Sequence, residues 1–166
     1  ARIDALTQTW NRRYSEELIT NRIKNNGNGL FCLFDVDNFK TINDSFGHIT
    51  GDQLLKKISH IVCESITDDD VFGRLGGDEF VLYLKGDFQE CINRLNSIMI
   101  KLKFNYYEND RKIKIECSAG LAKIQGRRAS FNELYESADA ALYEAKRLGK
   151  GNYKISLASL IEDDDE

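Results

Sequence analysis

The sequence predicts one α+β domain built around a mainly antiparallel β-sheet with helices packed against it. Two apolar, β-rich runs at residues 71–75 and 80–84 are joined through Gly76-Gly77. A glycine pair between such runs is typical of a β-hairpin with a type I′ turn, because both central residues of that turn need positive φ. A third apolar run, at residues 30–34, has the length of a strand buried on both faces.

Before the hairpin, the chain is predicted to form a helix, a strand and two more helices. Residues 7–11 precede apolar residues at near-helical spacing, and an Asn/Gly-rich stretch at 25–29 ends this first helix. After the strand, a short helix is expected over 39–46 and a longer one after Gly51. The apolar face of the longer helix comprises Leu54, Leu55, Ile58, Ile61, Val62 and Ile66. We expect this face to pack on the sheet.

After the hairpin, Asp87 is expected to cap a helix that carries a continuous apolar stripe. A strand pattern covers residues 113–124, and Ser130 begins a capping box for a last long helix. A short strand at 153–155 closes the sheet. The order β-α-α-β-β-α-β, with a central sheet flanked by helices that we expect on one side, is that of a palm-like fold related to the ferredoxin-like plan.

Length and composition are those of a single domain spanning residues 1–166. Of its 166 residues, 42% are hydrophobic and 30% are charged, which suffices to bury a core. The net charge of −4 argues against a nucleic-acid binder that depends on a basic face. No apolar segment is long enough to span a membrane and no signal peptide opens the chain, so we expect a cytoplasmic segment without membrane contact. The acidic end, residues 157–166, is expected to be frayed.

The cysteines and the first residue of the chain lead to two further predictions. The four cysteines, Cys32, Cys63, Cys91 and Cys117, stand singly within apolar periodic segments. They show no C-x-x-C or Cys/His spacing, so we expect buried free thiols and no zinc site. The chain begins at Ala1 without an initiator methionine. We therefore expect the C-terminal output domain of a longer protein, with a sensor domain upstream.

Two acids, Asp78 and Glu79, follow the glycine pair at the tip of the predicted hairpin. The bare glycine backbone would let a bulky anion approach, but carboxylates repel a phosphate unless a cation lies between them. On these residues alone, a solvated hairpin tip bearing two acids explains the pattern at least as well. Asp35 directly follows the run at 30–34, and if that strand lies beside the hairpin, all three acids meet. Such convergence favours two-metal nucleotidyl transfer.

Several separated motifs identify a family. The segments D-V-D-N-F-K-T-I-N-D-S-F-G-H-I-T-G-D at 35–52 and R-L-G-G-D-E-F at 74–80 resemble those of the diguanylate cyclase (GGDEF) family. The likeness extends from D-A-L-T near the N-terminus to A-D-A-A-L-Y-E-A-K-R-L-G-K-G-N at 138–152. It implies a nucleotide cyclase-like fold and an enzyme that condenses two GTP molecules into cyclic di-GMP and two pyrophosphates. It also implies that two copies of the domain face each other as a transient homodimer.

The resemblance allows other functions besides synthesis, and it also predicts which residues bind metal. Some family members are catalytically silent modules that bind GTP or cyclic di-GMP, and a third possibility is an interaction domain that kept only the fold. The intact G-G-D-E-F favours the active cyclase. By family likeness, Mg²⁺ or Mn²⁺ would be bound by Asp35, Asp78 and the backbone carbonyl of Val36, all hard oxygen donors. Glu79 would bind metal or help to deprotonate the 3′-hydroxyl, and with Asp78 it forms the expected catalytic pair.

Substrate contacts follow from the same likeness. Asn43 and Asp52 match guanine-contacting positions, although by themselves they also suit a helix end and a helix cap. His48 belongs to the same loop, where it touches the substrate or shapes the loop. The expected phosphate-binding residues are Lys40, Lys146 and Lys150, together with Gly76 and Gly77 of the turn. A solvated basic helix end is the alternative explanation for Lys146 and Lys150.

Three departures from the family pattern are visible. Gln8-Thr9-Trp10 replaces the Gly-Leu part of the opening motif, and an extra glycine at Gly151 interrupts the usual G-[R/K]-N. Many relatives carry an R-x-x-D product-inhibition site shortly before the glycine turn, where this chain reads Thr67-Asp68-Asp69-Asp70. The missing arginine and the crowded acids predict weak inhibition by cyclic di-GMP.

Overall fold

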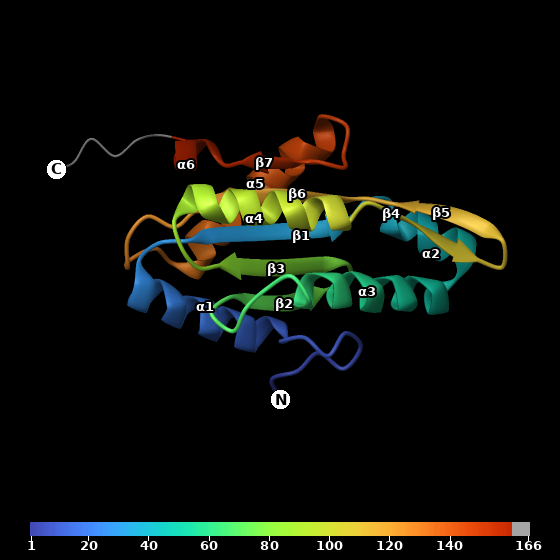
Figure 1. The fold of residues 1–166 in the computed structure, drawn as a ribbon, viewed down its shortest axis with the longest axis horizontal. Helices are drawn as coiled ribbons and strands as arrows, with labels where there is room; N and C mark the ends of the chain where they lie inside the picture. The colour runs from blue at the N-terminus through green and yellow to red at the C-terminus, as the bar shows by residue number, and fades with distance from the viewer. Residues whose placement is uncertain (161–166) are drawn as a thin grey trace.

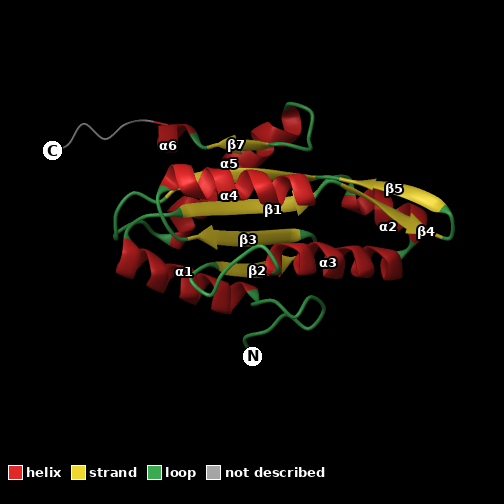
Figure 2. Cartoon of the chain, in the orientation of Figure 1, coloured by secondary structure: helices red, strands yellow, loops and turns green. Residues whose placement is uncertain are grey.

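The computed structural model describes residues 1–160, and it contains the strands and helices that the hydrophobic periodicity predicts (Figures 1 and 2). In chain order the elements are α1 Arg12–Asn26, β1 Leu30–Val36, α2 Phe39–Phe46, α3 His48–Cys63, β2 Val71–Gly76, β3 Glu79–Leu84, α4 Phe88–Lys101, β4 Phe104–Glu108, β5 Arg111–Ile115, β6 Cys117–Lys123, α5 Phe131–Arg147, β7 Tyr153–Ile155 and α6 Leu157–Leu160. Asp87 and Ser130 cap α4 and α5 as predicted, each accepting a backbone N–H of the first helical turn. No helix within the described range is long and apolar enough to cross a membrane.

The central sheet has the strand order β2-β3-β1-β6-β7, and all its pairings are antiparallel except that of β6 with β7. Strand β1 lies in the middle, and every one of its seven residues is buried, as its uninterrupted apolar run predicts. The register places Asp35 opposite Glu79 on β3 and opposite Ser118 on β6. The prediction that β1 lies beside the hairpin is therefore confirmed.

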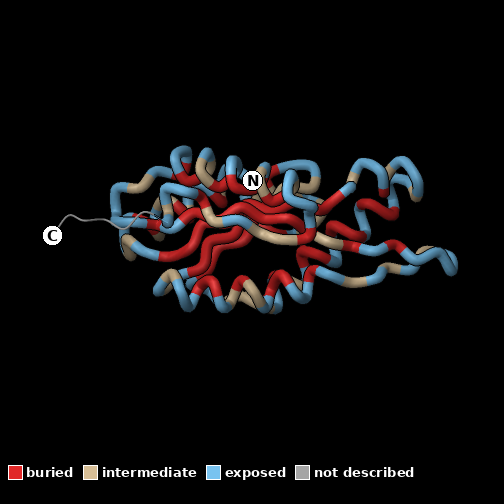
Figure 3. Tube along the Cα trace, turned by 90° about the horizontal axis from the view of Figure 1, so that it is seen from above, coloured by how far each residue is buried: buried red, intermediate tan, exposed pale blue. Residues whose placement is uncertain are grey.

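The helices cover both faces of the sheet, which corrects the expectation of helices on one side. Leu30, Cys32 and Phe34 of β1 join a core with residues of α3 and α4. Phe31 and Leu33, which alternate with them, join a second core with residues of α1 and α5. Figure 3 shows the buried sheet between two helical layers. Because residues 30–34 of β1 are all apolar, each face of the strand must be covered to exclude water.

The hairpin turn differs from the predicted type I′ turn. Gly76 pairs with Glu79, so the two loop residues are Gly77 and Asp78 rather than the two glycines. Both glycines have positive φ, 146° and 51°, but Asp78 does not, whereas a type I′ turn requires positive φ at both loop residues. Asp78 therefore lies within the turn.

Other details also correct the sequence-based expectations. The strand pattern at 113–124 is divided into β5 and β6, and β4 pairs with β5 in a separate hairpin that projects beside α2 (Figure 2). Cys63 is exposed, whereas the three other cysteines are buried and all four are free. The expected frayed tail begins with the short helix α6, and its remaining part, 161–166, lies outside the described residues.

Candidate functional site

The candidate site lies where the C-terminal end of β1 meets the glycine turn and the C-terminal half of α5. Asp35 is 7% exposed, and its Oδ2 accepts an ion-paired hydrogen bond from Lys146 Nζ. Its other oxygen, Oδ1, is buried and has no hydrogen-bond partner. A buried acceptor without a partner is costly, so this carboxylate is suited to an additional cation.

Burial governs the acid–base character of the two nearest carboxyls. It raises the pKa of Asp35 to about 6, against the opposing effect of Lys146. Burial likewise raises the pKa of Asp78, although backbone N–H groups, including that of Val36, and the Lys146 ammonium oppose the shift. Asp35, Asp78 and the Val36 backbone thus share one desolvated corner. Carboxylate and carbonyl oxygens are donors that a hard divalent cation takes, so metal binding here stays a prediction.

Glu79 takes a different partner from the other acids. Its Oε1 accepts a 2.7 Å hydrogen bond from the hydroxyl of Tyr135 on α5. Burial and this contact raise the pKa of Tyr135 to about 12. Within residues 1–160, no cluster of three or more His, Cys, Asp or Glu side chains is arranged to hold a metal ion.

Tyr135 and Lys146 contact different acids of the site, Glu79 and Asp35 respectively. Both lie on α5, and their spacing in the chain corresponds to about three helical turns, or roughly 16 Å of helix. They therefore project from the same side of α5, each holding one of two carboxylates that face each other across β1 and β3. The tyrosine contact has no signal in the sequence, because Tyr135 sits in the apolar periodicity of a core helix.

A buried acid that the sequence reasoning did not single out lies two residues beyond Asp35. Asp37 is 8% exposed; its Oδ1 accepts from Ser118 Oγ at 2.6 Å and its Oδ2 from the Gly151 N–H at 2.8 Å. The second acid of the D-x-D motif was the signal available for it. Asp37 joins the end of β1 to the loop that follows α5.

That loop carries the expected phosphate-binding Lys150. Its ammonium donates a 2.7 Å hydrogen bond to Asn38 Oδ1 at the start of α2. Lys150 and Asn38 both have left-handed backbone conformations, with φ of 65° and 59°. The two ends of the site are thereby tied together across more than a hundred residues of sequence.

The expected base-contacting residues gather at the junction of α2 and α3. Asn43 packs against the bare backbone of Gly51, where an added Cβ would lie 1.8 Å from Asn43 Oδ1. That oxygen is buried and has no hydrogen-bond partner. Helix α3 begins at His48, so the loop expected around His48 is instead the first helical turn; His48 and Asp52 are both exposed. Lys40, in the first turn of α2, is also exposed.

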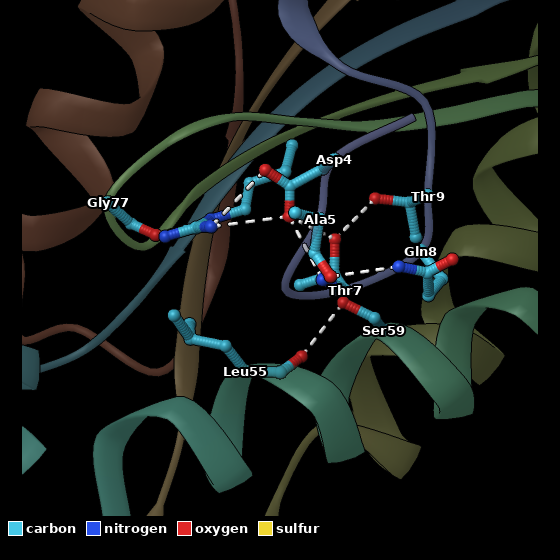
Figure 4. Close-up of polar contacts among 9 residues, drawn as sticks. Asp4, Ala5, Thr7, Gln8, Thr9, Leu55, Ser59 and Gly77 are labelled. Carbon is cyan, nitrogen blue, oxygen red and sulfur yellow. Dashed lines mark hydrogen bonds and ion pairs between the residues drawn. The ribbon is translucent and has the colours of Figure 1, made fainter. Parts of the chain in front are cut away.

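An arginine, Arg74, links the glycine turn to the N-terminal segment. Arg74 Nε donates to the carbonyl of Gly77 at 2.9 Å, and its NH1 contacts Asp4 Oδ2 at 3.2 Å. Asp4 also accepts from the backbone N–H and hydroxyl of Thr7. Figure 4 shows the Asp4–Thr9 turn folded between the hairpin and α3. The D-A-L-T segment therefore braces the turn that presents Asp78.

Residues 67–70, where many family members carry the product-inhibition site, expose fewer negative charges than the sequence indicates. Asp70 is 6% exposed and forms a two-pronged salt bridge with Arg94 of α4. Although burial opposes ionisation, hydrogen bonds from Arg94 and backbone N–H groups lower the pKa of Asp70. Arg22 donates to the backbone carbonyls of Asp68 and Asp69. The expected patch of three repelling acids is thus reduced to two exposed carboxylates.

Comparisons with known proteins agree with this architecture. Residues 1–152 match the family described as "Diguanylate cyclase, GGDEF domain". The diguanylate cyclase DgcS of Shewanella oneidensis is 34% identical over 164 residues, covering 96% of this chain and 54% of DgcS. The cyclic di-GMP phosphodiesterase PdeR of Escherichia coli is 32% identical over 159 residues, which cover 93% of this chain and 24% of PdeR.

A solved structure gives the same result for the fold. The GGDEF domain of DgcB from Caulobacter crescentus, crystallised with c-di-GMP, superposes with a TM-score of 0.84 at 25% identity. The match covers 93% of this chain and 95% of that domain. This chain spans about half the length of DgcS, so the activity of the whole protein does not follow from the likeness alone.

Proposed function

This chain belongs to the diguanylate cyclase GGDEF-domain family, and from that membership we propose that it condenses two GTP molecules into cyclic di-GMP and two pyrophosphates. The observation that carries the proposal is the corner shared by Asp35, Asp78 and the Val36 backbone beside the open glycine turn. Lys146 brings a positive charge to the same corner. This combination is suited to phosphates and a cation, and an ordinary surface hairpin would not require it.

Asp35, Asp78 and the carbonyl of Val36 would hold Mg²⁺ or Mn²⁺. The bound ion would supply charge neutralisation at the phosphates of GTP. Lys146 and Lys150 would bind the triphosphate from the α5 side, and Lys40 would bind it from α2. Gly76 and Gly77 let it approach the turn, because a Cβ built on either residue meets no atom within 4 Å.

In the reaction, the 3′-hydroxyl of each GTP attacks the α-phosphorus of the other. A new P–O bond forms, the bond to the bridging oxygen breaks, and pyrophosphate leaves with that electron pair. The hydroxyl proton passes to Asp78 or Glu79. Tyr135 would fix the orientation of Glu79.

The base would be selected by Asn43 and Asp52. A carboxylate accepts hydrogen bonds from N1–H and the exocyclic amine of guanine, whereas adenine has no donor at N1. His48 lies in the first turn of the same helix as Asp52 and completes this end of the site. Since one domain holds one GTP in this arrangement, two copies must face each other to join two nucleotides.

A second candidate function is a silent module that binds GTP or cyclic di-GMP and regulates a partner domain. It is favoured by the likeness to PdeR, which is named a phosphodiesterase. Incubating the protein with GTP and Mg²⁺ and measuring cyclic di-GMP by mass spectrometry distinguishes the two. Product from the wild type but not from Asp78→Asn supports the cyclase. GTP binding without any product supports the regulatory module.

A further inference from the structure

The loop between α5 and β7 has little freedom of its own. Lys150 and Gly151 both have left-handed backbone conformations, with φ of 65° and 64°. A Cβ on Gly151 would lie 2.2 Å from Glu116 Oε2, the end of a flexible side chain that can move aside. The Lys150 N–H donates to the carbonyl of Ala145 at 3.1 Å. The extra glycine of the sequence therefore suits the left-handed conformation of the loop at this position.

Asp37 is the side chain that holds the loop in place. It accepts from the Gly151 N–H at 2.8 Å, and that N–H also lies 3.0 Å from Ser118 Oγ, which donates to Asp37 in turn. The backbone N–H of Asp37 donates to the Glu116 carbonyl at 2.9 Å. These contacts form a closed, buried triangle of a carboxylate, a hydroxyl and an amide. Such charge-assisted bonds are among the stronger ones in a protein interior.

We propose that Asp37 is a positioning residue that sets the place of Lys150, and so of the phosphate-binding loop, relative to the acids at the end of β1. The inference rests on the proposed function, in which Lys150 binds GTP phosphates. The chain of contacts runs from Asp37 through Gly151 to the adjacent Lys150. Lys150 in turn reaches back to Asn38, the residue that follows Asp37.

Two other roles for Asp37 are less consistent with its contacts. As a metal ligand, Asp37 would have to share oxygens that already accept hydrogen bonds from Ser118 and Gly151, whereas Asp35 Oδ1 has no partner. As a bare negative charge, it would weaken the binding of an anion nearby, so its removal would strengthen that binding. A positioning role predicts the opposite sign, because a displaced Lys150 contacts the phosphates less well.

The experiment measures binding of pyrophosphate with Mg²⁺ by calorimetry, which needs no turnover. Asp37→Asn keeps the side-chain shape and one acceptor, and we expect it to weaken binding by about 3- to 10-fold. Lys150→Met should weaken binding by about 10-fold or more through loss of a charged contact. In the Lys150→Met background, Asp37→Asn should have almost no further effect. Glu136→Gln, which removes an exposed carboxylate of α5, is the charge control and should leave binding unchanged.

A structural readout accompanies the binding data. Hydrogen exchange of the amides at 149–152, followed by mass spectrometry without metal or nucleotide, should be faster in Asp37→Asn than in the wild type. Ser118→Ala, which leaves the direct bond from Gly151 to Asp37, should accelerate exchange less. Tighter pyrophosphate binding in Asp37→Asn, or equal weakening in both Lys150 backgrounds, would overturn the proposal.

Failure of the proposed function gives a different pattern. In that case the wild type binds neither pyrophosphate nor GTP and makes no product, while exchange at 149–152 still responds to Asp37→Asn. Failure of the positioning role alone leaves wild-type binding and the Lys150→Met defect intact. The two results are therefore separated by measurements on the same set of variants.

Discussion

Replacing Asp35 by asparagine should abolish synthesis of cyclic di-GMP and yet stabilise the metal-free protein at neutral pH. Burial raises the pKa of Asp35 from 3.8 to about 6 in the folded protein. The folded state therefore holds the proton more tightly than the unfolded state does, and ionisation of Asp35 destabilises the fold. This penalty is absent below pH 3.8, develops as the pH rises, and is complete above the folded-state pKa.

The size of the effect follows from the shift. A shift of about two pKa units corresponds to roughly 3 kcal/mol at 1.36 kcal/mol per unit, which is an upper limit because the amide of asparagine also needs hydrogen bonds. Allowing for this, Asp35→Asn should raise the free energy of unfolding by about 1–2 kcal/mol at pH 7. For a domain of this size, the midpoint of thermal unfolding should rise by roughly 2–8 °C.

Urea unfolding in EDTA at pH 7 and at pH 4 measures this change. The wild type should lose stability relative to Asp35→Asn as the pH rises through this range. Asp70→Asn provides the contrasting control, since hydrogen bonds from Arg94 and the backbone lower the pKa of Asp70. Its replacement should destabilise the protein at pH 7 and by nearly as much at pH 4, because the loss shrinks only as the pH falls below 3.8. If Asp35→Asn is less stable than the wild type at pH 7, burial does not dominate the energetics of this carboxylate.

Other variants test single parts of the site. Asp78→Ala should abolish product formation with little change in the thermal midpoint, because burial already disfavours its ionised form; wild-type turnover would contradict its assignment. Asp52→Ala should weaken GTP binding by about 1.5–3 kcal/mol, or roughly one to two orders of magnitude, and reduce discrimination against ATP in a competition assay. An unchanged GTP/ATP ratio would assign base recognition elsewhere. Cyclic di-GMP should inhibit only in competition with GTP, because Thr67 offers no guanidinium and Asp70 is occupied by Arg94; potent non-competitive inhibition in initial-rate assays would show a separate product site. Specific activity should rise with protein concentration, and a flat profile would refute the requirement for two facing domains.

The sequence predicts most of the fold because its apolar periods are clear. The uninterrupted run of β1 indicates a buried strand, and Asp87 and Ser130 mark helix starts that the structure confirms. The apolar run at residues 30–34 already indicated that helices lie on both faces, since five consecutive apolar residues of a strand need cover on both sides. The turn was misplaced by one residue, because a β-bulge between Arg74 and Gly76 shifts the register of the hairpin.

The contacts that shape the site were not predictable in the same way. Tyr135 meets Glu79 across 56 residues of chain, and Asp37 meets Gly151 across 114. Such pairs depend on how far α5 is displaced along its axis relative to the sheet, which packing of the whole core decides and which no local period records. Family likeness gave the acids and lysines, but not the partners that hold them.

Those partners explain how the folded protein tolerates the buried carboxylates of Asp35 and Asp78. Asp35 and Asp78 are both held where burial disfavours their charge. Nearby contacts compensate: Lys146 pairs with Asp35, Arg74 ties the Gly77 carbonyl to Asp4, and the Asp37 triangle holds the α5–β7 loop. Since Lys146, Arg74 and Asp37 make these contacts without ligand, the acids keep their positions before nucleotide arrives. Substitutions in these contacts should therefore lower both stability and activity, whereas substitutions of Asp35 or Asp78 should lower activity without lowering stability.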